Sequence, residues 1–263
     1  ASDGKLLTDG QGLFVKEIEE AMLRGEIDLA VHSMKDVPTE FPEGLGLVVT
    51  TKREDPRDAL ISRDICFKDL PPNARIGTSA LRRQAQLLAV RPDLEMVIIR
   101  GNVETRIRKL EEDKLDAVIL AAAGLNRLGF AEKATELLSV DLSIPAIGQG
   151  ALGLECRLND VETREMLAFL NHPPTAAAVS AERALLRRCE GGCQVPIAAH
   201  GVVTGEHLTL TGLIASVDGR EIIKEVAEGS FHEPEKLGEG LADLLLAQGG
   251  KRILEEVYQR ALN

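Results

Sequence analysis

Apolar residues follow two different spacings along the first 170 residues. Helical spacing predicts amphipathic helices at residues 13–23, 80–90, 103–112 and 161–170. Short apolar runs predict buried strands at residues 27–31, 45–51, 75–77, 96–99, 117–122 and 152–156. Strands that alternate with helices favour a parallel sheet covered on both faces. Thr78 with Ser79, and Asn102, stand where helix caps are expected.

Two segments interrupt this alternation and indicate a two-lobed molecule. Residues 51–56 are charged and end in proline, and residues 144–151 are rich in Gly and Pro. We interpret both as segments that cross between lobes. The first lobe then takes residues 1–51 and 148–170, and the second takes residues 56–144.

A third part begins after Pro173-Pro174. It contains a predicted helix at 175–188, alternating strands at 198–203, 208–215 and 221–229, and a final helix at 235–262 interrupted near 249–250. Gly205 and Gly219 mark the hairpin turns. Residues 173–263 therefore predict an α+β domain with an antiparallel sheet.

Composition narrows the class of protein. The 263 residues carry a net charge of −11 and include no Trp, which argues against broad binding to nucleic acid or to an anionic membrane. No apolar run is long enough to span a bilayer. Four irregularly spaced cysteines suit a reducing compartment. The chain starts at Ala1 without a signal-like segment.

Charged residues gather where predicted strands end, which is where open α/β sheets bind ligands. They are Lys35, Asp36, Arg82, Arg83, Arg100, Arg106 and Arg127. Arg82 and Arg83 stand in the first turn of a predicted helix, where the dipole favours anions instead. Arginine is shaped for bidentate capture of carboxylate or phosphate. The pattern predicts a cleft for a polyanion, with solvated surface charges as the alternative.

Asp36 is the one acid in that group. Nearby cations should lower its pKa and keep it ionised. An ionised carboxylate in a cationic pocket can hold N–H donors or stabilise a developing cation. An ion pair with Lys35, or a cap on the following turn, is the structural alternative.

Cys193 follows two glycines in Glu190-Gly-Gly-Cys-Gln-Val-Pro196. The glycines permit a tight turn that can present the thiol to another domain, and sulfur is strongly nucleophilic near neutral pH. A small buried hydrophobe is the alternative. A metal site is less favoured, because Cys189 and Cys193 lack a second ligand pair.

Together these motifs resemble the porphobilinogen deaminase family. The matching stretches are Gly12-Leu-Phe-Val-Lys-Glu17, Val31-His-Ser-Met-Lys-Asp-Val-Pro38, Glu54-Asp-Pro-Arg-Asp58, Gly77-Thr-Ser-Ala-Leu-Arg-Arg83, Arg100-Gly-Asn-Val-Glu-Thr-Arg106, Pro145-Ala-Ile-Gly-Gln-Gly150 and Glu190–Pro196. They cover nearly the whole chain in family order.

The resemblance implies a transferase that joins four porphobilinogen units head to tail, releases ammonia from each and frees hydroxymethylbilane. It implies two lobes like type II periplasmic binding proteins plus the third α+β domain. It also implies a cytoplasmic monomer that binds no metal, nucleic acid or membrane.

Residue roles also follow from the resemblance. A dipyrromethane cofactor would be held in thioether linkage by Cys193 and contacted by Lys35, Asp36, Thr78, Arg82, Arg83 and Arg106. Asp36 would be the catalytic group. Arg100, Arg106 and Arg127 would bind substrate.

The chain departs from the family pattern in two ways. Family members have about one strand and one helix before the Gly-rich opening, with an Arg and a Ser that contact the tetrapyrrole. We therefore expect this polypeptide alone to be poorly soluble or inactive. Ala80 replaces a usual serine. A two-lobed module that binds a small carboxylate without chemistry, and an inactive truncated form, are the alternative functions.

Overall fold

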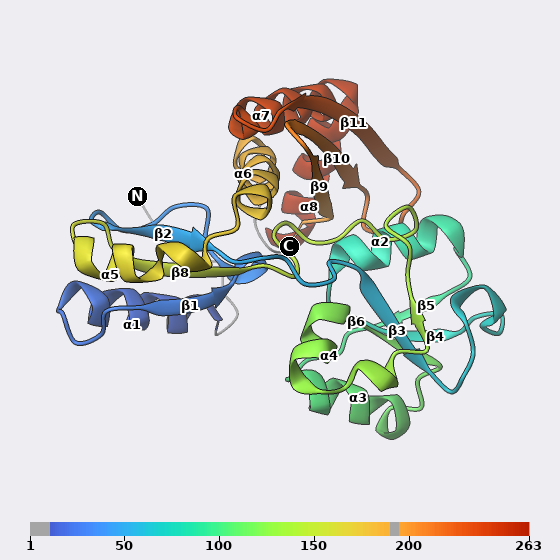
Figure 1. Cartoon of the computed structure of the whole chain (residues 1–263). Helices are drawn as coiled ribbons and strands as arrows, with labels where there is room; N and C mark the ends of the chain where they lie inside the picture. Colours follow the sequence, from blue (N-terminus) through green and yellow to red (C-terminus); the bar gives the residue numbers. More distant parts are fainter. Residues whose placement is uncertain (1–10, 190–194, 263) are drawn as a thin grey trace.

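The computed structural model describes residues 11–189 and 195–262. Figure 1 shows two α/β lobes joined by two extended segments, with a third domain packed above them. The fold class predicted from the sequence is therefore confirmed. We call residues 51–57 the first crossing and residues 144–151 the second crossing.

The first lobe is built on a three-stranded sheet in the order β1-β8-β2. Its elements are α1 (Gln11–Leu23), β1 (Ala30–Ser33), β2 (Leu45–Thr50), β8 (Leu152–Arg157) and α5 (Val161–Leu167). Met22 of α1 is fully buried against Ala30 and Leu45. Helix α1 therefore supplies the apolar cover that its predicted periodicity required.

The second lobe has a five-stranded sheet in the order β5-β4-β6-β3-β7. Its strands are β3 (Asp58–Ser62), β4 (Arg75–Gly77), β5 (Glu95–Val97), β6 (Ala117–Ala121) and β7 (Glu136–Leu137). Its helices are α2 (Leu81–Val90), α3 (Val103–Glu112) and α4 (Ala122–Leu128). Two clusters of buried aliphatic side chains pack against this sheet, as expected for a chain without Trp.

The expectation of parallel sheets was wrong for one strand in each lobe. Strand β8 is antiparallel to β1 and β2, and β3 is antiparallel to β6 and β7. Both β3 and β8 begin directly after a crossing, with Asp58 opposite Ala121 and Leu152 opposite Ser33. A strand that enters a lobe from the edge between the lobes must run away from that edge, whereas β1, β4 and β6 end there.

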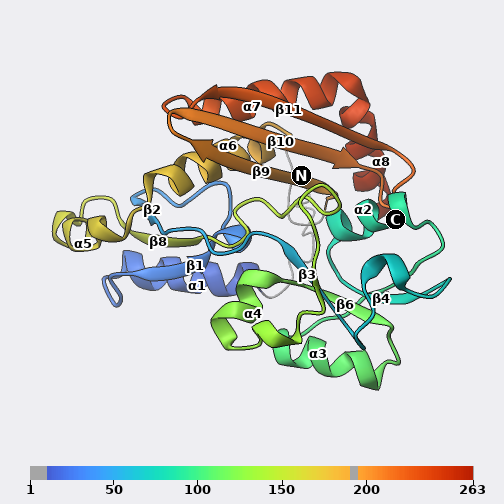
Figure 2. The ribbon, with the colours of Figure 1, turned by 45° about the vertical axis from the view of Figure 1, so that its right-hand side comes forward.

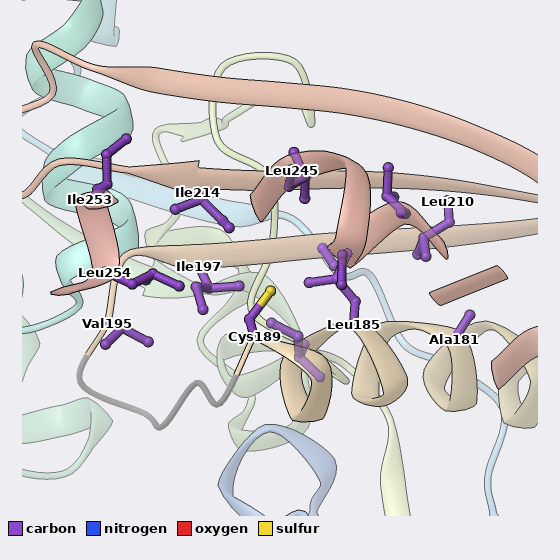
Figure 3. Close-up of a cluster of buried hydrophobic side chains, with 14 of the residues drawn as sticks. Ala181, Leu185, Cys189, Val195, Ile197, Leu210, Ile214, Leu245, Ile253 and Leu254 are labelled. Carbon is purple, nitrogen blue, oxygen red and sulfur yellow. The ribbon is translucent and has the colours of Figure 1, made fainter. Parts of the chain in front are cut away.

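The third domain packs helices on one face of an antiparallel sheet (Figures 1 and 2). Its elements are α6 (Pro173–Arg188), β9 (Ile197–Thr204), β10 (His207–Ala215), β11 (Ile222–Ser230), α7 (Pro234–Leu245) and α8 (Lys251–Leu262). Figure 3 shows its aliphatic core, with Leu185 and Leu245 facing Leu210 and Ile214. Gly249, at φ 113°, interrupts the last helix where the sequence placed the break.

Of the two predicted helix caps, one was confirmed and one was wrong. Asn102 caps α3, because its side chain accepts a hydrogen bond from Thr105 N at 2.8 Å. The expected cap at Thr78 and Ser79 was wrong, since α2 begins after Ala80 and has no side-chain cap. Thr78 Oγ1 instead accepts a hydrogen bond from Ala80 N. Strand β3 was not predicted, because its apolar run, Ala59–Ile61, is only three residues long and directly follows the charged first crossing.

Candidate active site

The edge between the lobes collects the charged residues that the sequence singled out. Lys35 and Asp36 lie in one turn of 3₁₀ helix, Met34–Asp36, directly after β1. Met34 is 2% exposed and anchors this turn, whereas Asp36 is exposed. Gly148 of the second crossing, at φ +71°, lies so close to Met34 that a Cβ there would be 2.7 Å from Met34 Cβ. The turn therefore packs closely against the second crossing.

Lys35 of the first lobe lies near the cations of the second lobe. Burial lowers the pKa of Lys35, and the nearby Arg83 guanidinium lowers this pKa further. Asp36 opposes the shift. Lys35 makes no ion pair within 4.0 Å with the carboxylates of the described residues. A partly buried ammonium group beside an arginine favours an anionic ligand.

Arg106 faces Asp36 across the same edge. It lies in the first turns of α3, where its Nε donates to Gly101 O at 2.7 Å. Burial lowers the pKa of Arg106, and Asp36 partly opposes that shift. Asp36 of the first lobe and Arg106 of the second therefore act on each other electrostatically.

Arg100 and Arg127 lie further out on the second lobe, and both are exposed. Arg100 comes three residues after β5 ends, and Arg127 is in the last turn of α4. Nη2 of Arg127 donates to Gly150 O at 2.7 Å, so it reaches the second crossing. The predicted cations thus lie along one edge, with Arg82 and Arg83 at its inner end.

Arg82 and Arg83 are buried around a carboxylate that the sequence analysis did not single out. Asp58 is fully buried at the start of β3. It accepts bonds from Nη1 and Nη2 of Arg82 at 2.7 and 3.0 Å, and from Nε and Nη2 of Arg83 at 3.0 and 2.7 Å. Ser143 Oγ and Gln149 Nε2 also donate to it. We call these five residues the Asp58 cluster.

The Asp58 cluster explains how two arginines can stand in the first turn of α2. Burial alone would raise the pKa of Asp58, but the two guanidinium groups more than reverse this and hold its pKa well below the usual range. Asp58 thus supplies the anion that the helix dipole favours there. A signal for it was present, since Asp58 follows the charged first crossing and ends the Glu54–Asp58 motif.

Donors remain on both arginines. Arg82 makes four bonds with its terminal nitrogens, to Asp58, Ile144 O and Gln149 Oε1. Arg83 makes three, to Asp58 and Ile119 O. Since a guanidinium has five N–H groups, one on Arg82 and two on Arg83 are unused within the part of the chain that the structure describes.

A second ion pair ties the crossings to the third domain. Nη1 and Nη2 of Arg53 donate to the carboxylate of Glu182 at 2.7 and 2.8 Å. Glu182 is fully buried in α6 and also accepts from the backbone N–H of Gly148 and Gly201. Four hydrogen-bond donors thus surround the Glu182 carboxylate. They tie both crossings to helix α6 and strand β9 of the third domain. Sequence reasoning missed it, because the two residues are 129 positions apart.

Three cysteines are free thiols in the structure: Cys66, Cys156 and Cys189. Burial raises the pKa of Cys156, and it raises that of Cys189 to about 12. Figure 3 shows Cys189 at the end of α6, in the apolar core of the third domain. Thiols of this kind are poor nucleophiles. Cys193, the predicted attachment residue, lies outside the described residues.

The first lobe contains a further buried charged group, which we call the Glu155 cluster: Glu19, His32 and Glu155. Nε2 of His32 lies 2.8 Å from Glu155 Oε2. Glu19 is 7% exposed and Glu155 is fully buried, and Oε1 of each lacks a hydrogen-bond partner among the described residues. Burial raises the pKa of Glu19, and Glu155 raises it further.

Two features, a metal-binding cluster and a membrane-spanning helix, are absent from the described residues. Within residues 11–189 and 195–262, no three His, Cys, Asp or Glu side chains gather closely enough to hold a metal ion. No helix in the same ranges is both long and apolar enough to cross a membrane.

Fold and site define a class: a two-lobed α/β protein whose interlobe edge carries the exposed carboxylate of Asp36 among cations from both lobes. Family models match in two places, the "Porphobilinogen deaminase, dipyromethane cofactor binding domain" over residues 4–165 and the "Porphobilinogen deaminase, C-terminal domain" over residues 176–247. The chain belongs to the porphobilinogen deaminase family.

Relatives agree with the family models. The porphobilinogen deaminase of Trichlorobacter lovleyi is 77% identical over 96% of this chain and 81% of that protein. That of Geobacter sulfurreducens is 74% identical over 97% of this chain and 80% of that protein. Among solved structures, the aliphatic sulphonate binding protein SsuA of Escherichia coli matches 65% of this chain and 56% of its own, with 15% identity and a TM-score of 0.38.

Proposed function

We propose that this chain polymerises four porphobilinogen units head to tail into hydroxymethylbilane, with Asp36 as the catalytic group. The observation that carries the proposal is the turn Met34–Asp36 at the end of β1, in which Lys35 is electrostatically coupled to Arg83 and Asp36 to Arg106 of the second lobe. A chain with this sequence similarity and this edge is a transferase of tetrapyrrole synthesis.

The cations fit a ligand with several carboxylates. Each pyrrole unit carries an acetate and a propionate, so a dipyrromethane presents four carboxylates. Lys35 and Arg106 make no ion pair within the described chain, and Arg82 and Arg83 keep unused N–H groups. We infer that these four residues, with Thr78 and Asp36, hold the cofactor, and that Cys193 carries it. When bound, the dipyrromethane supplies the pyrrole carbon to which the first unit is added.

Asp36 would act on the substrate. An exposed carboxylate beside the pyrrole N–H can stabilise the positive charge that develops on the substrate ring as ammonia leaves. A carboxyl group that has first taken up a proton from solvent can pass it to the departing amine, which leaves the carboxylate ionised beside the new cation. Arg100, Arg106 and Arg127 would hold the carboxylates of the incoming unit, since Arg127 reaches the crossing from the outer end of the edge.

We also propose the finer features of this enzyme. Residues 1–51 with 148–170, 56–144 and 173–263 form its three domains, which agrees with one sheet in each. It acts as a monomer in the cytoplasm, without nucleic acid. The net charge of −11 supports the absence of nucleic acid, the free thiols of Cys66, Cys156 and Cys189 support the reducing compartment, and the monomeric state rests on the family resemblance alone.

The test combines mass and colour. Intact protein should exceed its sequence mass by two linked pyrrole units and should colour with an aldehyde reagent for pyrroles. Cys193→Ala should lose both signals, whereas Cys189→Ala should keep both. Ammonia and a linear tetrapyrrole should form from porphobilinogen. Protein that turns over with an unmodified Cys193 would contradict the attachment, and absence of colour and turnover would favour a binding module.

A further inference from the structure

The side chain of Gln149 joins both crossings to helix α2. Gln149 lies in the second crossing and is 1% exposed. Its Nε2 donates to Pro56 O of the first crossing at 2.6 Å and to Asp58 Oδ1 at 2.9 Å. Its Oε1 accepts from Nη2 of Arg82 at 3.0 Å. Both ends of the amide are therefore committed inside the protein.

The backbone around Gln149 makes a second set of links. Nε of Arg53 donates to Gln149 O at 2.8 Å, and Glu54 N donates to Gly150 O at 3.1 Å. At Gly150, with φ +91°, a Cβ would lie 2.5 Å from Glu54 O, so the two crossings approach too closely for any side chain. Gln149 thus contacts the first crossing near both of its ends, at Arg53 and at Pro56.

The same amide is coupled to the cations of the interlobe edge. It bonds Arg82 directly and reaches Arg83 through Asp58. Arg82 in turn donates to Ile144 O of the second crossing. The spacing of the crossings therefore depends on a buried amide that also contacts Arg82, while Asp58, Ile144 O and Ile119 O hold the two guanidinium groups in place.

We propose that Gln149 is a positioning residue: it fixes the angle between the lobes, and with it the alignment of Asp36 against the second-lobe arginines, without touching substrate. The inference rests on the proposed function, in which the bound chain lengthens at each addition. When the bound pyrrole chain is short, the two lobes contact each other and this contact aligns Asp36. A longer bound chain holds the lobes apart, so only the two crossings keep Asp36 aligned with the second-lobe arginines.

Gln149→Met tests this inference, because Met has a similar length and forms none of these bonds. Holoprotein is mixed with porphobilinogen, and the bound intermediates are followed by intact mass. The cofactor should be retained and the first addition should stay within about threefold of wild type, while the last two additions slow by about tenfold or more, as expected for a misaligned reacting group. Gln149→Asn, whose amide is one carbon shorter, should show the same pattern.

Val257→Ala is the matched control, since it opens a cavity in the third-domain core and removes none of the hydrogen bonds of Gln149. It should lower the melting temperature and slow no particular addition. Equal slowing of all additions in both Gln149 variants would make Gln149 merely structural and would overturn the inference, as would wild-type kinetics in either variant. Wild-type protein that forms no intermediates would instead count against the proposed function.

Discussion

The two lobes bury charge in opposite ways. In the second lobe, the Asp58 cluster gives one carboxylate six donors from four side chains. In the first lobe, the Glu155 cluster places two carboxylates around one histidine and leaves an oxygen of each without a partner in the described chain. The energetic cost of burying an ion depends on such partners.

The difference shows that burial alone does not indicate what a charged group does. Compensated charge in the Asp58 cluster holds two arginines and both crossings in one geometry. In the Glu155 cluster, burial and the neighbouring Glu155 raise the pKa of Glu19, so the stability of the first lobe should depend on pH through Glu19. Asp36 lies on the first lobe, on the edge that faces the second lobe and its Asp58 cluster. Because Asp36 is exposed, substrate can reach it.

Asp58→Ala should have the largest effect on stability. It leaves two buried guanidinium groups without their counterion, and breaking a buried pair from one side costs about 3–5 kcal/mol. Chemical denaturation measures the loss in the free energy of unfolding. Asp55→Ala is the control, because its pair with the partly exposed Arg57 should contribute about 1 kcal/mol or less. Equal losses in the two variants would remove the distinction between the clusters.

Asp36→Asn should lower turnover by a factor on the order of 10² or more, the effect of losing one preorganised electrostatic contact. The fold and the bound cofactor should be unchanged, as measured by melting and intact mass. Glu40→Gln, an exposed acid on the same lobe, should keep normal turnover. Near-normal turnover in Asp36→Asn would reduce Asp36 to an ion-pair role.

His32→Ala should destabilise the first lobe by about 1–3 kcal/mol, because it removes the partner of a fully buried Glu155. The free energy of unfolding at neutral pH measures this loss. His207→Ala, at an exposed position, is the control and should change it little. A neutral effect of His32→Ala would show that its hydrogen bond to Glu155 contributes little to the stability of the first lobe.

Glu19→Gln should have the smallest effect on the free energy of unfolding, and it should stabilise the protein where Asp58→Ala and His32→Ala destabilise it. The pKa of Glu19 is higher in the folded chain than its ordinary value of 4.5, so the stability linked to its proton is present below that value and lost as pH rises through the raised pKa. Gln carries no charge to bury. The variant should therefore gain stability above the raised pKa and match wild type near pH 4.

Unfolding measured from pH 4 to 8 checks this expectation. Glu20→Gln, the exposed neighbour on α1, should follow the wild-type curve. A Glu19→Gln gain that did not depend on pH would mean that the amide makes a new hydrogen bond and that burial of charge is not the cause.

The sequence by itself determined most of the local structure. Helical periodicity located α1, α2 and α3, and Gly249 broke the last helix where expected, because these signals act within a few residues. A charged run that ends in proline located the first crossing, and the Gly and Pro residues of 144–151 located the second. The positions of the cations were expected from the sequence, because they follow the predicted strands and open α/β sheets bind ligands at the carboxyl ends of their strands; how the edges of the two sheets face each other was not.

Tertiary structure decided the directions of β3 and β8 and the partners of the buried charges. A strand's direction depends on the edge at which the chain enters the lobe, which no local pattern records. Asp58 meets Arg82 from 24 positions away, and Glu182 meets Arg53 from 129. Such pairs form because a buried ion needs a counterion wherever the fold can bring one, so they follow from packing and cannot be seen in periodicity.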